Sequence, residues 1–529
     1  MYYLGVNCNF NGPTHENSVC LFKDGNYIDF IEEERLSKNK HSLCELPTRA
    51  INELLRRNNL SIKDIDYSNV SPQDFEKYFC IGEKYPTLIK IGNHHYHHAL
   101  DSFYKSGYEN GAVIIIDSSD NNEYCITLAE ISKNGYNEIK RFSSLYSLGD
   151  LYTEATLYAD LGGNAEGKFM GLSSYGNDLG VRFIKFSPKD CRLFFNFKLK
   201  NNPIMASKYE IFKDEFGKIF PYSSRKNNNI DIIQYKDFAA TIQANYEEVL
   251  LGLVNYLYEK TIYKENLILG GGCIQNINGN DLICRKSKFK NIYCSSTPHD
   301  SGAAFGICCD MVIKNGGCIN NISYDEKIFS KKTYTQEDYK RASYFLNFNK
   351  VDINVIINLI KDNKILAWFQ GGSEFGPRAL GHRSIVCLPN EKIMGTIVNN
   401  IKHRENWRPL APIIPEELFE NVIETNGNLS LYEHMLRKSY IKDGYKQLLK
   451  AVCHIDGSTR PQILKKEYNP KLYNVIMELY KQTGIPALIN TSFNNAGMPI
   501  VETPNDAMMY FTHSNIDVMV WDGEYITRK

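Results

Sequence analysis

The sequence predicts two consecutive α/β domains, and the first of them is built from a duplicated unit. A three-strand pattern occurs twice within residues 1–145. A long helical segment then leads into an apolar strand, and such alternation is typical of α/β folds. The periodicity is lost within residues 315–340, and a second series of strand and helix patterns follows. We therefore expect one domain at residues 1–330 and another at residues 340–529.

The repeated unit consists of three predicted strands joined by tight turns. YYLGVNC, NSVCLF and YIDFIEEER form the first copy, with Lys23-Asp24-Gly25-Asn26 as the second turn. Asp-Gly between alternating apolar residues is a strong hairpin signal. AVIIIDSSD, NEYCITLAEI and NEIKRFSS repeat the pattern around Asn134-Gly135. Two halves that each open with a hairpin facing a shared cleft are typical of the actin-like fold. Two unrelated hairpins are the alternative.

The remaining elements follow from hydrophobic periodicity. Residues 235–262 have apolar positions at helical spacing, and NLILGGG reads as the strand after them. SSTPHDSGAAFGICCDMVI contains small residues that allow a helix to pack closely. In the second domain we expect strands at KILAWFQ, SIVCLP, PALINTS and DVMVWD, and helices at INLIKDN and YNVIMELYKQTG.

Composition excludes several classes of protein. Lys+Arg and Asp+Glu are both 61, so the zero net charge argues against a chain that wraps nucleic acid or coats a membrane. The 14 cysteines form no C-x-x-C pair, which disfavours zinc ribbons and redox dithiols. The sequence shows neither a signal peptide nor a membrane span. We expect a cytoplasmic protein.

The densest chemical cluster is His94-His95-Tyr96-His97-His98. On a helix, His94 and His98 share one face, which suits two imidazole ligands of one divalent metal. Asp117 ends the strand AVIIID, and Asp300 lies in His299-Asp300-Ser301-Gly302. The alternative is a solvated, histidine-rich helix end.

Two glycine-containing segments are candidates for nucleotide binding. Gly271 and Gly272 follow a strand and precede Asn276, so backbone N–H groups could approach phosphate and an amide could hold ribose or base. Lys168 lies in EGKFMGL and adds a cation. The alternatives are a simple strand terminus and a surface lysine.

The second domain concentrates basic residues in turns. GPRALGHRS contains Arg378, IKHRENWRP contains Lys402 and Arg408, and DGSTR ends at Arg460. The segment LINTSFN, with Asn490 and Ser492, reads as a strand end that opens into a polar loop. Guanidinium and ammonium groups flanked by Gly and Pro favour a pocket for a small polyanion. Surface residues paired with acids are the alternative.

Together these segments resemble the NodU/CmcH family of carbamoyltransferases, which includes the tobramycin carbamoyltransferase type, over nearly the whole chain. The landmarks occur in the family's order: His15-Glu16-Asn17-Ser18, Glu33–His41, HHxxHA at His94–Ala99, EGKFMGL at Glu166–Leu172, GG followed by Asn276, HDSGAA, EFGPRALGHRSI at Glu374–Ile385, IKHREN, and NTSFN at Asn490–Asn494. The chain departs from the family at Glu16, where Asp is usual, and at His382, where Asn is usual. Leu388-Pro389-Asn390 replaces the family's DPR, and the effect of this change is left open.

The resemblance implies a Kae1-like domain with the actin-like fold, followed by a YrdC-like domain. The YrdC-like domain would condense carbamoyl phosphate with ATP, assisted by Mg²⁺, to carbamoyladenylate. The Kae1-like domain would transfer the carbamoyl group to a hydroxyl, or an amine, of a small-molecule natural product, as in antibiotic biosynthesis. The implied ligands of a divalent metal, with iron expected, are His94, His98, Asp117 and Asp300. The implied pocket for carbamoyl phosphate and ATP consists of Arg378, Lys402, Arg408, Arg460 and Ser492.

The acceptor hydroxyl needs a base, and His15 is our candidate. Lys402 and Arg408 are the candidate catalytic cations. A homodimer is left open, and the acceptor cannot be read from the sequence. The alternatives are a tRNA threonylcarbamoylation enzyme, which would need a basic footprint that the net charge does not supply, a hydrogenase-maturation carbamoyltransferase, which would carry zinc-finger cysteine pairs, and a non-catalytic actin-like nucleotide-binding protein.

Overall fold

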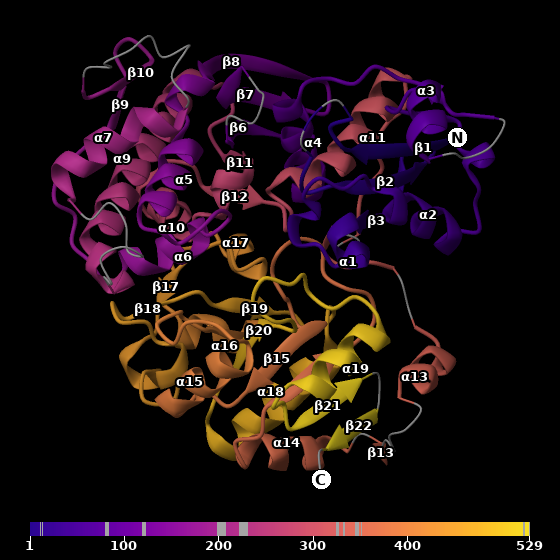
Figure 1. The fold of residues 1–529 in the computed structure, drawn as a ribbon, viewed down its shortest axis with the longest axis vertical. Helices are drawn as coiled ribbons and strands as arrows, with labels where there is room; N and C mark the ends of the chain where they lie inside the picture. Colours follow the sequence, from indigo (N-terminus) through magenta and orange to yellow (C-terminus); the bar gives the residue numbers. More distant parts are fainter. Residues whose placement is uncertain are drawn as a thin grey trace.

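The structure is a computed structural model that describes residues 1–10, 12, 14–79, 84–118, 123–197, 208–221, 231–323, 327–331, 334–343, 349–350, 352–521 and 524–527. The chain forms two lobes from its N-terminal part and a third body from its C-terminal part, which lies below both lobes in Figure 1. Among the described residues, no helix is both long and apolar enough to cross a bilayer.

The two upper lobes are built on sheets of the same topology. One sheet has the order β3-β2-β1-β4-β5 and the other has β12-β11-β6-β7-β8, which is the same arrangement read in the opposite direction. In each, the first strand pairs antiparallel with the next strand of its hairpin and parallel with a later strand. The predicted duplication is therefore confirmed. The strands of the two sheets are β1 Tyr2–Asn7, β2 Ser18–Lys23, β3 Asn26–Glu32, β4 Tyr67–Ser68, β5 Thr87–Leu88, β6 Asn110–Ile116, β7 Tyr124–Ser132, β8 Gly135–Ser143, β11 Asn266–Gly270 and β12 Asn291–Cys294.

Two helices fill the space between these sheets. α4 (His94–Ser106) packs on β6 and β11, α11 (Ala303–Lys314) packs on β1 and β2, and the two helices pack on each other. Asn93 caps the first turn of α4, and Gly107 ends the helix in the left-handed conformation. A Cβ at Gly306 would lie 2.0 Å from the carbonyl oxygen of His97, so this close helix pair requires glycine there.

The outer faces of the lobes are covered by further helices. α2 covers the first sheet and α9 lies on the outer side of the second, where it packs with α5, α6 and α10. The predicted strand YIDFIEEER is wrong in its last part, because the chain leaves β3 at Glu32 and forms the short helix α1. The helices and minor strands of this part are α1 Glu33–Ser37, α2 Thr48–Arg57, α3 Pro72–Asp74, α5 Leu148–Tyr158, α6 Glu166–Ser173, β9 Ile184–Ser187, β10 Arg192–Phe195, α7 Lys208–Ile219, α9 Lys236–Lys260 and α10 Ile277–Lys286.

The C-terminal body contains an eight-stranded mixed sheet of order β13-β22-β21-β14-β15-β20-β16-β19. Its core lies on both faces of this sheet, under α15, α16 and α19 on one face and under α14 and α18 on the other. The elements are α13 Gln336–Ala342, β13 Asn349–Lys350, α14 Ile353–Lys361, β14 Leu366–Phe369, β15 Arg383–Cys387, α15 Lys392–Ile401, β16 Ala411–Pro415, α16 Glu416–Val422, α17 Ser430–Glu433, β17 Ser439–Tyr440, β18 Ser458–Thr459, β19 Gln462–Leu464, α18 Pro470–Thr483, β20 Leu488–Ser492, α19 Pro504–His513, β21 Val518–Trp521 and β22 Glu524–Thr527.

Among the described residues, no sheet combines strands from the upper lobes and the lower body, but the two parts are in close contact. Short 3₁₀ and π turns complete the connections, and they are η1 Lys40–Ser42, η2 Ile62–Asp64, η3 Phe75–Phe79, η4 Ser144–Tyr146, η5 Ile232–Tyr235, η6 Gly272–Gln275, η7 Asp300–Gly302, η8 Asp443–Tyr445 and η9 Lys450–Val452. α17 packs on β12 of the upper lobe, and Arg437 forms a buried ion pair with Asp281 at 3.2 Å. The upper and lower parts are thus joined by specific polar contacts as well as by apolar packing.

Candidate metal centre and anion site

Four side chains converge where α4 meets the ends of two other elements. His94 and His98 lie one helical turn apart at the start of α4, Asp117 directly follows β6, and Asp300 opens η7 ahead of α11. One ligand atom from each residue lies within 4.8 Å of the others. The structure therefore brings together the four residues that the sequence singled out as metal ligands.

The distances among these atoms fit coordination of one cation. The two Nε2 atoms lie 2.9 Å apart. Asp117 Oδ2 is 3.1 Å from His98 Nε2 and 3.3 Å from His94 Nε2, and Asp300 Oδ1 is 3.2 Å from His94 Nε2. Ligand atoms placed about 2.1 Å from one ion are separated by about 3.0–3.4 Å. Asp117 Oδ2 is buried and forms no hydrogen bond with the described residues despite these short distances, which suits an oxygen aimed at a cation.

The charges in this cluster balance one another. Burial opposes the protonation of His94, but Asp300 and Asp117 outweigh it and hold the pKa of His94 well above its usual range. Burial likewise raises the pKa of Asp117 and Asp300, but the two histidines reverse the sign, and both carboxyl pKa values are lowered. Two histidines and two carboxylates are a donor set that suits a divalent transition metal.

The glycine turn after β11 supports Asp117. The backbone N–H of Gly272 donates to Asp117 Oδ1 at 3.2 Å, and that of Ser118 donates to the same oxygen at 2.9 Å. Gly271 has φ 91°, and a Cβ there would lie 2.3 Å from the carbonyl oxygen of Ile116. The sequence predicted that Gly271 and Gly272 cradle phosphate. Their contacts in the structure fix a neighbouring strand and a candidate metal ligand, and phosphate binding at this turn stays a prediction.

A second polar layer lies beside the metal cluster and was not predicted from the sequence. Glu16 Oε2 lies 3.2 Å from His299 Nε2, accepts a hydrogen bond from Ser301 at 3.2 Å, and Glu16 Oε1 contacts His41 Nδ1. Burial disfavours charge on His299, but Glu16 prevails and raises the pKa of His299 to about 9. The sequence did contain a signal for this polar layer, because a histidine directly precedes an acidic residue in both His15-Glu16 and His299-Asp300. His15 itself is half-buried next to Glu16.

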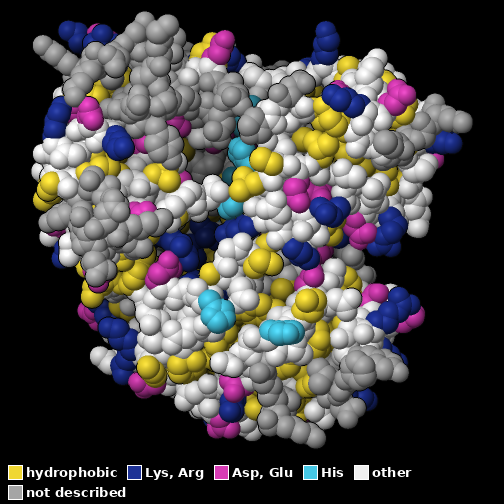
Figure 2. All heavy atoms as spheres, viewed as in Figure 1, with side chains coloured by type: hydrophobic (Ala, Val, Ile, Leu, Met, Phe, Trp, Pro, Cys, Tyr) yellow, Lys and Arg dark blue, Asp and Glu magenta, His cyan; other side chains and the backbone are white. Residues whose placement is uncertain are grey.

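The basic residues predicted for a pocket also come together, and they come from separate turns of the C-terminal body. Arg378 follows the Gly376 turn, Lys402 and Arg408 follow α15, and Arg460 follows β18. In Figure 2, histidine side chains line the groove between the two upper lobes, and lysine and arginine side chains gather where this groove meets the lower body. Arg404 and Lys40, which the sequence did not single out, belong to the same electrostatic neighbourhood.

Acids compensate this cation cluster only in part. Glu405 Oε2 lies 3.9 Å from Arg408 Nη1 and opposes the lowering of the pKa values of Arg404 and Arg408. Burial lowers the pKa of Arg378 to about 10, and the charge of Arg408 adds to the effect. Burial and Arg408 also lower the pKa of Arg404 to about 9. The pKa of Arg460 is held well below its usual range by burial and by Arg378, Arg404 and Arg408. Because guanidinium groups keep their proton in proteins, these arginines are partly buried cations that repel one another, and an anion would offset their charge.

Lys402 lies beneath this cluster rather than at its surface. The residue is 3% exposed. Its ammonium donates to Ser492 Oγ at 3.2 Å, to Asn494 O at 2.7 Å and to Asn494 Oδ1 at 2.8 Å, and it also contacts the carbonyl oxygen of Ser492. Lys402 thus fixes the loop after β20 that carries Ser492.

The loop that carries Arg378 is shaped by a buried carboxylate. Glu374 Oε1 accepts the backbone N–H groups of Leu380 at 2.7 Å, His382 at 2.8 Å and Arg383 at 3.0 Å. His382 stacks on Phe329, with ring centroids 3.9 Å apart. The histidine at position 382, where the family pattern has Asn, is therefore accommodated by stacking on Phe329.

Asn490 supports the same loop from the sheet. The residue is 1% exposed, and its amide donates to the carbonyl oxygen of Ala379 at 2.9 Å and to Gln462 Oε1 at 2.6 Å. The sequence predicted that Asn490 contacts substrate or nucleotide. Its amide donors are bonded within the protein, so the contacts favour a supporting role.

Two other residues predicted to bind nucleotide have partners within the protein. Lys168, on α6, forms an ion pair with Glu405 of the lower body at 2.9 Å. Asn276 caps α10 through the backbone N–H of Gly279 at 3.0 Å and exchanges hydrogen bonds with Gln243. The sequence could not identify Glu405 and Gln243 as partners, because both are remote along the chain from the residues that they contact.

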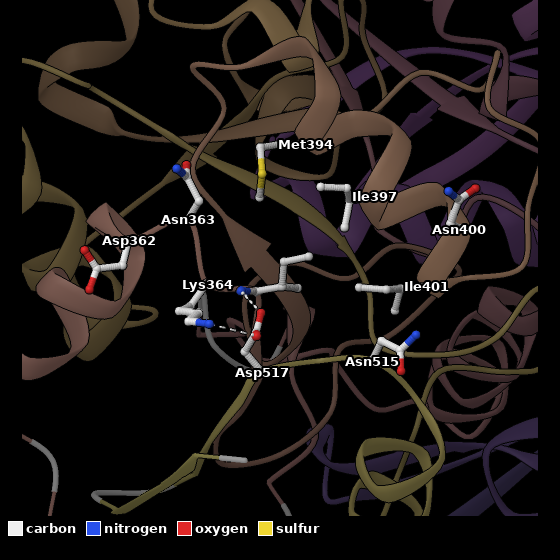
Figure 3. Close-up of a pocket in the computed structure, with 10 residues that line it drawn as sticks. Asp362, Asn363, Lys364, Met394, Ile397, Asn400, Ile401, Asn515 and Asp517 are labelled. Carbon is white, nitrogen blue, oxygen red and sulfur yellow. Dashed lines mark hydrogen bonds and ion pairs between the residues drawn. The ribbon is translucent and has the colours of Figure 1, made fainter. Parts of the chain in front are cut away.

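A pocket of about 380 Å³ lies elsewhere on the lower body (Figure 3). Its walls come from the turn before β14, from α15 and from the loop before β21. Asp517 accepts the backbone N–H of Ile365 at 2.9 Å and lies 3.4 Å from Lys364 Nζ, so its charge is already bonded. The walls combine this pair with asparagines and apolar side chains, and no cluster of uncompensated charge points into the pocket.

Family models match most of this chain. The model for the carbamoyltransferase N-terminus matches residues 81–309, and the model for the carbamoyltransferase C-terminus matches residues 357–528. The chain is 29% identical to nodulation protein NolNO of Sinorhizobium fredii, over 97% of this chain and 79% of that protein. It is 25% identical to nodulation protein U of the same organism, over 92% and 93% of the two chains. It is also 28% identical to the uncharacterized protein MJ1051 of Methanocaldococcus jannaschii, over 97% and 98%.

Two solved structures resemble parts of the fold. Component A of (R)-2-hydroxyglutaryl-CoA dehydratase from Acidaminococcus fermentans aligns with a TM-score of 0.32 at 14% identity, over 58% of this chain and 96% of that chain. Full-length HypF in its phosphate- and nucleotide-bound form aligns with a TM-score of 0.34 at 12% identity, over 59% and 56%.

Proposed function

The chain belongs to the carbamoyltransferase family and is a carbamoyltransferase, and we propose that it uses carbamoyl phosphate and ATP to carbamoylate a small molecule. Carbamoyladenylate forms at the cation cluster of the lower body, which we propose to be YrdC-like. The carbamoyl group then passes to a hydroxyl, or an amine, of an acceptor in the groove between the upper lobes. A small-molecule natural product is the acceptor class that we propose.

The incompletely compensated cation cluster is the observation that carries this proposal. Burial lowers the pKa values of Arg378 and Arg460, and the charge of Arg408 lowers both further from a separate turn. Repelling cations held together by a folded protein favour a ligand of several negative charges. ATP and carbamoyl phosphate are both anions that repel each other, and their reaction needs such clustered positive charge.

The atoms of the proposed reaction at the cation cluster balance when one water is included. Joining the carbamoyl group of carbamoyl phosphate to the adenylate of ATP releases pyrophosphate and orthophosphate and consumes one water. The arginines offset the charge that grows on the leaving phosphate oxygens. Lys402 keeps Ser492 and Asn494 in place through hydrogen bonds from its ammonium.

The upper groove then supplies the transfer step. An acceptor oxygen attacks the carbamoyl carbon, its proton leaves to a base, and AMP is expelled. His15 is the proposed base, and the neighbouring Glu16–His299–Ser301 contacts hold the segment that carries it. His94, His98, Asp117 and Asp300 fit a divalent cation, for which we propose iron. When bound, such an ion supplies positive charge that orients and polarises the adenylate phosphate.

Mass spectrometry tests the proposed reaction. Wild-type protein mixed with ATP, Mg²⁺ and carbamoyl phosphate should yield carbamoyladenylate, with pyrophosphate released in step with it. Omitting carbamoyl phosphate is the control, since ATP alone should then give no pyrophosphate. Turnover of both substrates without any carbamoyladenylate, or pyrophosphate release that ignores carbamoyl phosphate, contradicts the proposal.

A further inference from the structure

Arg378 lies in a turn of the lower body, residues 374–381, which we call the Arg378 turn. Its guanidinium forms no hydrogen bond or ion pair with the described residues, and its Nε atom is buried. A long side chain without a partner gains no fixed direction from its own contacts. The place of Arg378 in the cation cluster is therefore set by the backbone of the turn that carries it.

The upper lobe holds this backbone two residues before Arg378. The N–H of Gly376 donates to Glu32 Oε2 at 3.1 Å, and the carbonyl oxygen of Gly376 accepts from Arg35 Nη2. Glu32 and Arg35 lie 3.4 Å apart as an ion pair at the start of α1. Figure 1 shows α1 at the junction of the upper and lower parts. One buried ion pair of the upper lobe thus binds both backbone polar groups of a residue in the lower body.

Apolar packing seats the same turn against the upper lobe. Phe375 belongs to the apolar core between the two upper sheets, and its ring meets that of Phe30 edge-on at 4.9 Å between centroids. Gly376 has φ 86°, and a Cβ there would lie 2.3 Å from the carbonyl oxygen of Ser296. The turn therefore fits its place only with glycine at this position.

Arg35 acts on this turn and does not reach a substrate. The residue is 2% exposed, and it lines a cavity of about 10 Å³ together with Glu374. A cavity of this size accommodates about one water and no phosphate compound. Burial opposes the charge of Arg35, but nearby carboxylates, with Glu32 the largest contributor, outweigh it and raise the pKa of Arg35. Arg35 is thus a permanent buried cation whose contacts are carboxylates and one backbone carbonyl.

We propose that Arg35 is a positioning residue for Arg378, through which the upper lobe fixes the anion site of the lower body. The anion is a phosphate group of ATP or carbamoyl phosphate, so this inference rests on the proposed function. A planar guanidinium directs separate N–H groups at the Glu32 carboxylate and at the Gly376 carbonyl, whereas a lysine ammonium offers a point charge without that fork. Lysine at position 35 would keep the charge of the junction but release the turn.

The test is a double-mutant cycle that joins Arg35→Lys with Arg378→Ala. The readouts are the Kd for inorganic pyrophosphate by calorimetry and the KM for ATP in pyrophosphate release. Arg437→Lys is the matched control, because Arg437 is also buried and also crosses the junction, and its described contacts include no residue of the Arg378 turn. Losing a charge-assisted hydrogen bond should raise Kd roughly ten- to a hundredfold in Arg378→Ala.

Arg35→Lys should raise Kd and KM by about fivefold or more in the wild-type background, because the turn is no longer held. In the Arg378→Ala background the same change should alter Kd by less than about twofold, since residues that act through one another are not additive. In the Arg408→Ala background its full effect should remain, because Arg408 lies on a separate turn. Arg437→Lys should match wild type.

Two results would overturn the role of Arg35. One is a Kd and KM in Arg35→Lys that equal those of Arg437→Lys. The other is an equal loss from Arg35→Lys with and without Arg378, which would show a general weakening of the structure. Melting temperatures within a few degrees of wild type exclude a folding defect. If Arg35→Lys does not fold, Gly376→Ala disturbs the same turn from the lower body and is measured in the same cycle.

Failure of this inference and failure of the proposed function are distinguishable. Wild-type protein that forms carbamoyladenylate, with Arg35→Lys unchanged in Kd and KM, leaves the function standing. A wild type that binds pyrophosphate but forms no carbamoyladenylate contradicts the function, while coupling of Arg35 to Arg378 in Kd still supports the positioning role. A wild type that neither binds pyrophosphate nor turns over overturns both, because the anion site is then absent.

Discussion

The metal-type cluster and the cation cluster differ most in how their charges are compensated. In the first, two histidines face two carboxylates, and each histidine stabilises the charge of the neighbouring carboxylates. In the second, the pKa values of Arg378, Arg404 and Arg460 are all lowered, and Glu405 only partly opposes this at Arg404. Charges of opposite sign stabilise one another without a ligand, whereas charges of one sign that are held together favour the binding of a counterion.

The two clusters also differ in how they are assembled. The four histidine and aspartate residues all belong to the duplicated N-terminal part of the chain. The cations come from separate turns of the lower body, with Lys40 contributed by the upper lobe. The anion site is therefore sensitive to how the two parts are joined, while the metal-type cluster depends on the packing of α4 against β6 and η7.

The largest expected effect comes from His98→Ala. Removing this proposed metal ligand should strongly weaken metal binding and acceptor carbamoylation, because only three of the four donors remain. Pyrophosphate release should persist, since the cation cluster is untouched. Elemental analysis and both activities check this, with the exposed His513→Ala as control. His97 is a poorer control, because its Nε2 lies 3.3 Å from buried Asp310. Equal metal content in His98→Ala and wild type would show that the histidines are structural.

A smaller but still large effect is expected at the cation cluster. Arg408→Ala and Lys402→Ala should each lower pyrophosphate release by about 10²–10³-fold, the usual effect of losing one preorganised charge. Lys402→Ala acts by releasing Ser492 and Asn494, so in that variant the melting temperature should also fall. The exposed Arg56→Ala is the matched control. Release at the wild-type rate in both variants contradicts the anion site.

Because opposite charges are paired in one cluster and like charges are held together in the other, substitutions in the two clusters should change the free energy of unfolding in opposite directions. A chelator removes any bound metal, so that only the charges of the protein itself are compared. Asp117→Ala should lower the free energy of unfolding by about 3 kcal/mol, because it leaves buried histidines without their partner. Arg460→Ala should raise it by about 1 kcal/mol, because it relieves repulsion among cations. Denaturant unfolding at low ionic strength measures both. If Arg460→Ala destabilises the protein as much as Asp117→Ala, the cation cluster is compensated in a way that the described contacts do not show.

Adding pyrophosphate provides the matching ligand experiment. An anion at 100 times its Kd stabilises the folded protein by about 2.7 kcal/mol. The stabilisation of wild type should be largely lost in Arg460→Ala and kept in His98→Ala. A melting temperature that rises equally in all three proteins would place the anion elsewhere.

The smallest effect is expected for Lys168. Lys168 and Glu405 are both about one-third exposed in the structure, at 33% and 37%, and such ion pairs contribute less than about 1 kcal/mol. A double-mutant cycle with Lys168→Ala and Glu405→Ala should return a coupling in that range, with pyrophosphate release within about threefold of wild type. A tenfold or greater loss in Lys168→Ala alone would instead favour the nucleotide-binding role that the sequence predicted.

The sequence alone predicted the duplicated sheets, because hairpin turns and alternating apolar residues are local signals. It also predicted that His94 and His98 share a helical face, since three intervening residues fix that geometry. It grouped Arg378, Lys402, Arg408 and Arg460 by composition, and the structure brings these residues together. The end of YIDFIEEER was wrong, because a run of alternating residues did not reveal that α1 starts at Glu33.

Only the tertiary structure decided which predicted residues have partners within the protein. Gly272 faces Asp117, Lys168 faces Glu405 and Lys402 faces Ser492, and each partner is 90 or more residues away. The contacts between Glu16 and His299 and the environment of Lys40 depend on the same long-range packing. A sequence determines the residue types that chemistry needs, but the partner that neutralises or leaves open a charge is set by chain segments that meet only after folding.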